Sequence, residues 1–89
     1  MTRPPIDQSL WQPWIDHVCT AVGVDPALVD VGAIHVLSGE VAEVYERPMA
    51  PVAAHLWGLA RGVRPEASPD TLGAGIIEAA VQSGRAAAS

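Results

Sequence analysis

The chain has 89 residues, a net charge of -5, five arginines and no lysine. A chain of this length buries roughly 60% of the surface that its unfolded form exposes, which is enough for one hydrophobic core and argues against a second. The negative charge repels a phosphate backbone and disfavours nucleic-acid binding. Cys19, the one cysteine, excludes an internal disulfide and a thiolate cluster, so we expect a cytoplasmic protein.

No segment has the pattern of a secretion signal or a membrane anchor. The N-terminal stretch Met-Thr-Arg-Pro-Pro-Ile-Asp lacks an uninterrupted apolar run after its positive charge. The longest uncharged apolar stretch is broken by Pro51 and His55 and is shorter than the ~20 residues that a membrane span needs. We therefore expect neither export nor membrane anchoring.

Prolines and glycines recur at intervals of about one short helix, and no stretch alternates polar and apolar residues as a half-buried strand does. We predict an all-α protein, a compact bundle of four helices at about residues 9–22, 31–46, 49–61 and 69–83. One helical domain is expected over residues 9–84, between a flexible N-terminus at 1–8 and a frayed tail at 85–89.

The predicted helix at 9–22 has one amphipathic face. Its apolar residues recur at spacings of three and four, and they are Trp11, Trp14, Ile15, Val18 and Val22. Ser9 and Gln12 have capping-box spacing, and Gly23 suits a left-handed helix end. Cys19 has hydrophobic neighbours and no activating signal, which favours a buried structural thiol over a nucleophile.

Capping residues also mark the start of the helix at 31–46. Asp25 is expected to cap a short turn, and Asp30 is expected to cap the helix itself. The apolar positions of this helix are Ile34, Leu37, Val41 and Val44. Gly39 lies in the middle, where glycine costs ~1 kcal/mol relative to alanine. Either a kink or a close helix approach compensates for this cost, or the glycine is simply tolerated.

The helix at 49–61 is the most apolar segment, and we expect it to be central. Its stripe contains Met49, Val52, Leu56 and Leu59, which Ala53, Trp57 and Ala60 widen. Gly62 is an expected end signal for this helix. Ser68 is the expected cap of the helix at 69–83, and Gly84 its expected stop.

Candidate metal ligands lack the spacing that a site needs. His17, His35 and His55 fall on three different predicted helices. Metal sites in helical bundles use a glutamate followed three residues later by a histidine, but Glu40 is followed at that distance by Glu43. We therefore expect no metal and no cofactor.

Glu40, Glu43 and Glu46 are interpreted as a solvated acidic stripe, in which Glu43 is partly paired with Arg47 at a spacing of four. Ser38 lacks the strand-to-helix context of a nucleophile elbow, and the glycines match no phosphate-binding loop. The sequence thus predicts no catalytic residue.

The turn from Glu46 to Pro51 is the most distinctive local sequence. A purely structural interpretation is that its two prolines start the next helix and that Arg47 neutralises carbonyl groups at the end of the preceding one. The functional interpretation is an interaction surface, because arginine is enriched at interfaces. This surface would consist of Arg47, Pro48, Met49, Pro51 and Trp57.

Three segments, Leu10 to Gly23, Glu40 to Pro51 and Leu56 to Gly62, resemble an uncharacterised small helical domain of actinobacteria, over about residues 10–81. That family occurs alone or behind a MobA-like nucleotidyltransferase domain, in company with formate dehydrogenase and molybdenum-cofactor genes. The family pattern begins with an acidic residue and, three residues later, a histidine. A basic residue, a proline and an Ala-Pro pair follow. Glu43 departs from it, because it stands where the histidine is expected.

The sequence contains no pattern of catalytic residues or metal ligands. Together with this resemblance, that absence predicts a non-enzymatic accessory domain. It would bind a protein of molybdenum-cofactor or formate dehydrogenase maturation through the helix at 49–61 and the Arg47 turn. The alternative is a self-associating bundle, such as a homodimer, because that helix is apolar on most sides. A metal-binding or enzymatic bundle that uses the three histidines with Glu40 and Glu43 is the least favoured hypothesis.

Overall fold

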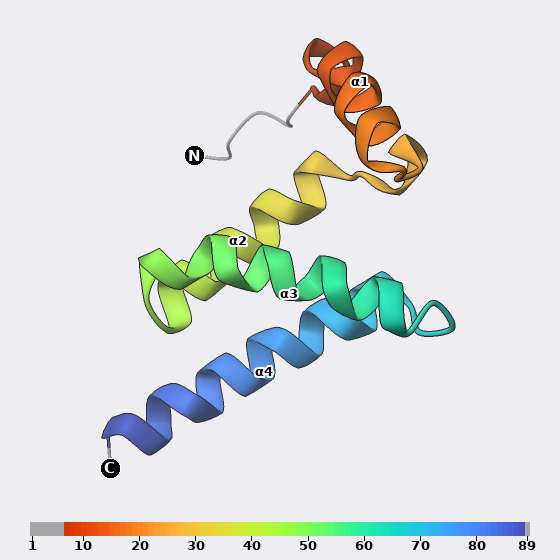
Figure 1. The fold of residues 1–89 in the computed structure, drawn as a ribbon. Helices are drawn as coiled ribbons and strands as arrows, with labels where there is room; N and C mark the ends of the chain where they lie inside the picture. The colour runs from red at the N-terminus through yellow and green to blue at the C-terminus, as the bar shows by residue number, and fades with distance from the viewer. Residues whose placement is uncertain (1–6, 89) are drawn as a thin grey trace. The chain divides into compact units, whose positions relative to one another are not determined.

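The computed structural model describes residues 7–88, and the side chains of residues 7–84 (Figure 1). Over this range the chain forms α-helices and short 3-10 helices and no strand, which confirms the all-α prediction. The α-helices are α1 (Gln12–Val22), α2 (Val31–Val44), α3 (Ala50–Val63) and α4 (Pro69–Ala88). The 3-10 helices are η1 (Gln8–Leu10), η2 (Pro26–Leu28) and η3 (Arg47–Met49). None of the helices described is long and apolar enough to cross a bilayer.

The chain divides into two units, Met1–Ile34 and His35–Ser89, with the boundary inside α2. The first unit starts with η1, which is capped by Asp7 through a hydrogen bond from the backbone N–H of Ser9. The predicted capping box of Ser9 and Gln12 is therefore wrong, because Ser9 lies inside η1 and α1 starts only at Gln12.

Gln8 joins η1 to the start of α2 and to the residues just before it. Its side-chain amide nitrogen donates to the carbonyl oxygen of Val29 at 2.9 Å, and its side-chain oxygen accepts from the backbone N–H of Val31 at 2.9 Å. Gln8 is thus an ordered part of the unit, although the sequence placed it in a flexible N-terminus. Residues 1–6 of that predicted segment lie outside the described residues.

The predicted helix caps are largely confirmed. The side chains of Asp25, Asp30 and Ser68 each accept a backbone N–H bond, at 3.0, 3.0 and 3.1 Å respectively. Gly23 ends α1 in the left-handed conformation, with φ 75°. These local signals fixed the starts of η2, α2 and α4 and the end of α1.

The apolar face of α1 is narrower than the sequence suggested. Ile15 and Cys19, which are four residues apart on one row of the helix, are buried, and Cys19 is a free thiol. Trp11 and Val22 are exposed, and the Trp14 side chain is 68% exposed. Trp14 precedes Ile15 by one residue and therefore points about 100° away from the buried row.

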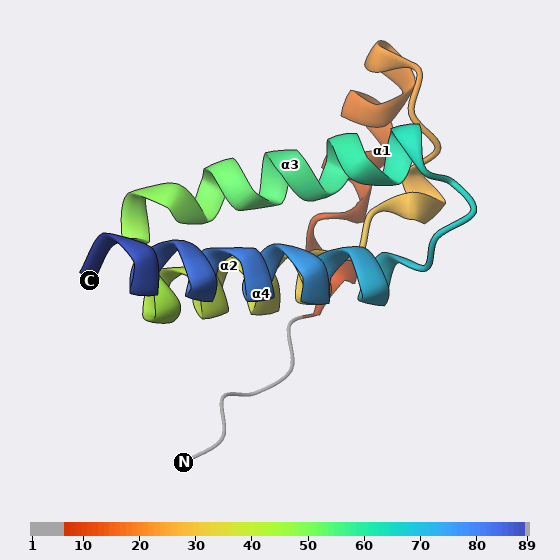
Figure 2. The ribbon, with the colours of Figure 1, turned by 90° about the horizontal axis from the view of Figure 1, so that it is seen from below.

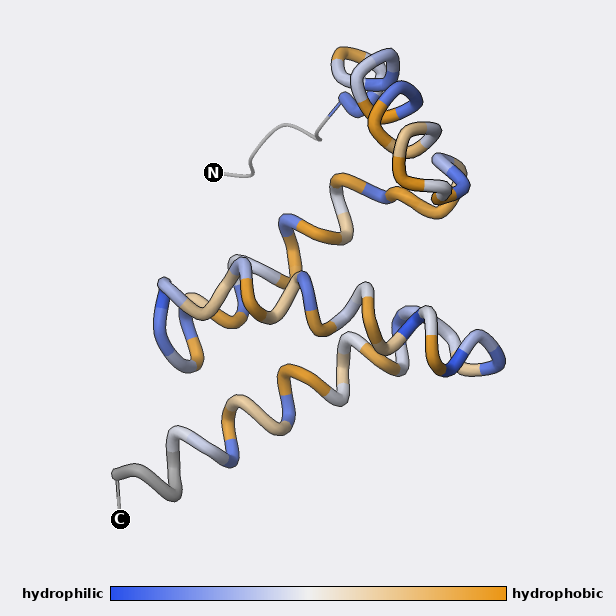
Figure 3. The backbone as a smooth tube through the Cα atoms, viewed as in Figure 1, coloured by the Kyte–Doolittle hydropathy of each residue, from blue (hydrophilic) through white to orange (hydrophobic). Residues whose placement is uncertain are grey.

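The second unit contains α3 and α4, which lie side by side and antiparallel (Figures 1 and 2). Apolar residues recur along both helices (Figure 3). The buried side chains of this unit are Leu37, Val41, Ala53 and Trp57. Both α2 residues belong to the predicted apolar positions of that helix, and Val41 is the least exposed of the four buried side chains, whereas Val44 is 39% exposed.

The apolar face predicted for α3 is buried only in part. The row that contains Ala53 and Trp57, which was expected to widen the apolar stripe, is buried, whereas the stripe itself is 37% to 54% exposed. That stripe consists of Met49, Val52, Leu56 and Leu59. Two adjacent apolar rows run along α3, and the row that includes the large indole packs towards α4.

Trp57 connects α3 with the start of α4. Its side chain is 6% exposed, and its indole N–H donates to the carbonyl oxygen of Pro69 at 2.9 Å. Gly73, one turn further along α4, lies beside the indole, since a Cβ atom there would be 3.6 Å from the indole nitrogen, an ordinary van der Waals distance. On α3, the guanidinium carbon of Arg61 lies 5.0 Å from the ring centroid, within cation–π range.

Two expected helix ends do not occur. Gly62 lies inside α3, and α4 continues through Gly84 to Ala88, so residues 85–88 of the predicted frayed tail are helical. A Cβ atom on Gly84 would lie 3.5 Å from the carbonyl oxygen of Val44 and 3.8 Å from the ring of Tyr45. Both are ordinary van der Waals distances, so Gly84 lies beside the end of α2. Ser89 lies outside the described residues.

We predict that Trp57→Phe lowers the free energy of unfolding by about 1–3 kcal/mol, because it removes the buried N–H donor and leaves a small cavity. Trp14→Phe is the matched control, since its side chain is exposed, and should change the free energy by less than about 0.5 kcal/mol. Urea denaturation followed by far-UV circular dichroism measures both. Equal effects of the two substitutions would contradict the assigned role of Trp57.

Glycine to alanine substitutions should have opposite effects at Gly23 and Gly39. Gly23→Ala forces a side chain into the left-handed region and should cost about 1–2 kcal/mol. Gly39→Ala should stabilise the protein by roughly 0.5–1 kcal/mol, because nothing lies within 4 Å of the added Cβ and alanine favours helix. Thermal melting measures both. A lower melting temperature for Gly39→Ala would indicate a close approach that the structure does not contain.

Candidate functional site

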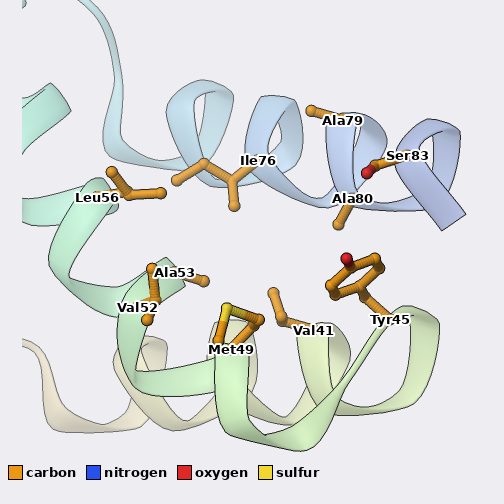
Figure 4. Close-up of a pocket in the computed structure, with 10 residues that line it drawn as sticks. All are labelled: Val41, Tyr45, Met49, Val52, Ala53, Leu56, Ile76, Ala79, Ala80 and Ser83. Atoms are coloured by element: carbon orange, nitrogen blue, oxygen red, sulfur yellow. The ribbon is translucent and has the colours of Figure 1, made fainter.

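An apolar cleft of about 340 Å³ opens in the second unit between the end of α2, α3 and α4 (Figure 4). Its lining consists of Val41, Tyr45, Met49, Val52, Ala53, Leu56, Ile76, Ala79, Ala80 and Ser83. Leu56 and Ile76 lie at one end of the cleft, and Tyr45 and Ser83 lie at the other. The hydroxyl groups of Tyr45 and Ser83 are the only side-chain oxygens among these ten residues.

The cleft follows from the helical periodicity of α3 and α4. The α3 side of the cleft spans about two turns, from Met49 just before the helix to Leu56, and it includes Val52 and Ala53. The facing residues of α4, from Ile76 to Ser83, have the same spacing. Large side chains line the α3 wall, whereas two alanines contribute to the α4 wall. Since alanine fills little space, the cleft stays open.

Several of the side chains that line the cleft are both apolar and exposed to solvent. Met49 is 37% exposed and Leu56 is 49% exposed, and Tyr45 and Val52 fall between these values. A contiguous exposed apolar surface of this kind is typical of interaction sites and ligand-binding grooves. No carboxylate, imidazole, guanidinium or thiol group occurs among the ten lining residues. The cleft is therefore suited to burying apolar surface.

The structure separates the five residues of the predicted interaction surface. Arg47, Pro48 and Met49 form η3 and are exposed, as is Pro51 in the first turn of α3. Met49 also lines the cleft. Trp57 does not belong to an exposed surface, because its indole is buried and bonded to α4.

Sequence reasoning missed the α4 wall and Tyr45. Ile76 and Ala80 are four residues apart and share one face of α4, but nothing in their spacing indicates which helix they meet. Tyr45 comes directly after α2, where the sequence suggested only a charged helix end. The small-residue spacing of Ala79, Ala80 and Ser83 is a signal that could have suggested a shallow helix face.

The acidic stripe and the histidines form no metal centre among the described residues. Glu40, Glu43 and Glu46 are exposed, as are His17, His35 and His55. Over the side chains that the structure describes, no group of three or more histidine, cysteine, aspartate or glutamate residues could hold a metal ion.

The expected ion pair between Glu43 and Arg47 does not form, since α2 ends at Val44 and Arg47 lies in η3. The spacing of four brings two side chains together only where the helix is continuous. An ion pair is present between Arg64 and Glu66, with 3.5 Å between Nε and Oε1. Both side chains are largely exposed, so this pair contributes little to stability.

The chain belongs to the DUF6457 family, a family of domains of unknown function, whose model matches residues 7–89. This match confirms the expectation of an uncharacterised small domain. No curated protein and no solved structure matches the chain. The family description assigns no activity.

Because no set of metal ligands converges among the described side chains, we predict that the natively purified protein contains far less than one metal ion per chain. Elemental analysis by mass spectrometry measures this content. Addition of a chelator should leave the melting temperature unchanged, since no described element depends on a metal. A stoichiometric metal that is lost together with stability on chelation would contradict this prediction.

Proposed function

We propose that this member of the DUF6457 family is a non-enzymatic accessory domain of the cytoplasm that binds another protein through the apolar cleft. The supporting observation is the cleft itself. Its α3 wall exposes large apolar side chains, and the ten residues that line the cleft have only two hydroxyl groups for polar chemistry. Such a surface gains free energy when a complementary apolar surface covers it.

The shape of the cleft favours a helix as the bound segment. Its walls run for about two turns along α3 and α4, or roughly 10 Å. An amphipathic helix inserts apolar residues at positions i, i+3 or i+4, and i+7 into grooves of this kind. The hydroxyl groups of Tyr45 and Ser83 supply hydrogen-bonding partners at one end only, which gives the bound helix a preferred direction.

We further propose that the partner belongs to molybdenum-cofactor or formate dehydrogenase maturation. This step rests on the resemblance of residues 10–81 to a small actinobacterial domain that also occurs behind MobA-like nucleotidyltransferase domains. The Arg47 turn adjoins the cleft through Met49, so the two predicted parts of the surface are continuous. Arg47 is exposed there and can pair with an acidic residue that flanks the partner helix.

Two leucines of α3 provide a matched test. Leu56 lines the cleft and is 49% exposed, whereas Leu59 lies outside the cleft and is 54% exposed. Burial of a leucine contributes about 1.5–3 kcal/mol, and 1.4 kcal/mol corresponds to a tenfold change in affinity. Leu56→Asp should therefore weaken binding by at least about tenfold, and Leu59→Asp by about twofold or less.

The measurement is isothermal titration calorimetry with a purified MobA-like nucleotidyltransferase and, separately, with formate dehydrogenase subunits from the native host. Circular dichroism and thermal melting establish that both variants are folded. Equal affinities of the Leu56→Asp and Leu59→Asp variants would show that the cleft is not the binding site. If none of these proteins binds the wild-type chain, the proposed partners are wrong.

The second candidate function is self-association, and the exposed stripe of α3 favours it. Met49, at the end of η3, and Val52, Leu56 and Leu59 of α3 are all exposed, and a second copy of the chain could cover them. Trp57 is unsuitable as a probe of this contact, because its replacement by aspartate would disrupt the packing of α3 on α4.

For a dimer that uses this stripe, sedimentation equilibrium should show a wild-type chain that dimerises as its concentration rises. Met49→Asp should then remain monomeric, because the substitution places an unpaired charge in the contact. Glu43→Ala, an exposed position of α2 away from the stripe, serves as the control and should dimerise like the wild type. A wild-type chain that stays monomeric at every concentration would exclude this candidate.

A further inference from the structure

We draw no further inference here: the strongest candidate, the aliphatic and aromatic surface that Leu10, Trp11 and Trp14 expose around the start of α1, carries none because nothing in the structure shows what covers it.

Discussion

The contact of Trp57 with the first turns of α4 is the constraint on which the second unit depends. A carbonyl oxygen has two lone pairs, so Pro69 can accept the indole N–H in addition to a bond within its helix. Gly73 lies beside the same ring, since a Cβ atom there would be at van der Waals distance from the indole nitrogen. Once this row of α3 faces α4, the neighbouring row with Leu56 is left largely uncovered, and the cleft is a direct consequence.

The local signals of the sequence were sufficient to predict the helices and most of their caps. A side-chain cap such as Asp30 involves only residues within one turn, so spacing alone identifies it. Glycine is a less certain signal, since the same residue type can end a helix or lie within one. Gly23 ends α1 in the left-handed conformation, whereas Gly84 lies inside α4.

The candidate site could be predicted only in part. Periodicity shows which residues share a helix face, but α3 carries two adjacent apolar rows, and the choice between them is made by contacts with α4. The sequence therefore identified Met49 as a surface residue and misplaced Trp57. Tyr45 and Ser83 come from distant parts of the chain, and neither gives a local indication that the other is near.

The distribution of the tryptophans has a consequence for spectroscopy. Trp57 lies in the second unit, buried and hydrogen-bonded, whereas Trp11 and Trp14 lie in the first unit and are exposed to solvent. Indole emission shifts to longer wavelength when the ring becomes hydrated, so loss of structure in the second unit has an optical signal of its own. A shift in the intrinsic fluorescence of the chain thus reports the unfolding of the second unit, without any attached label.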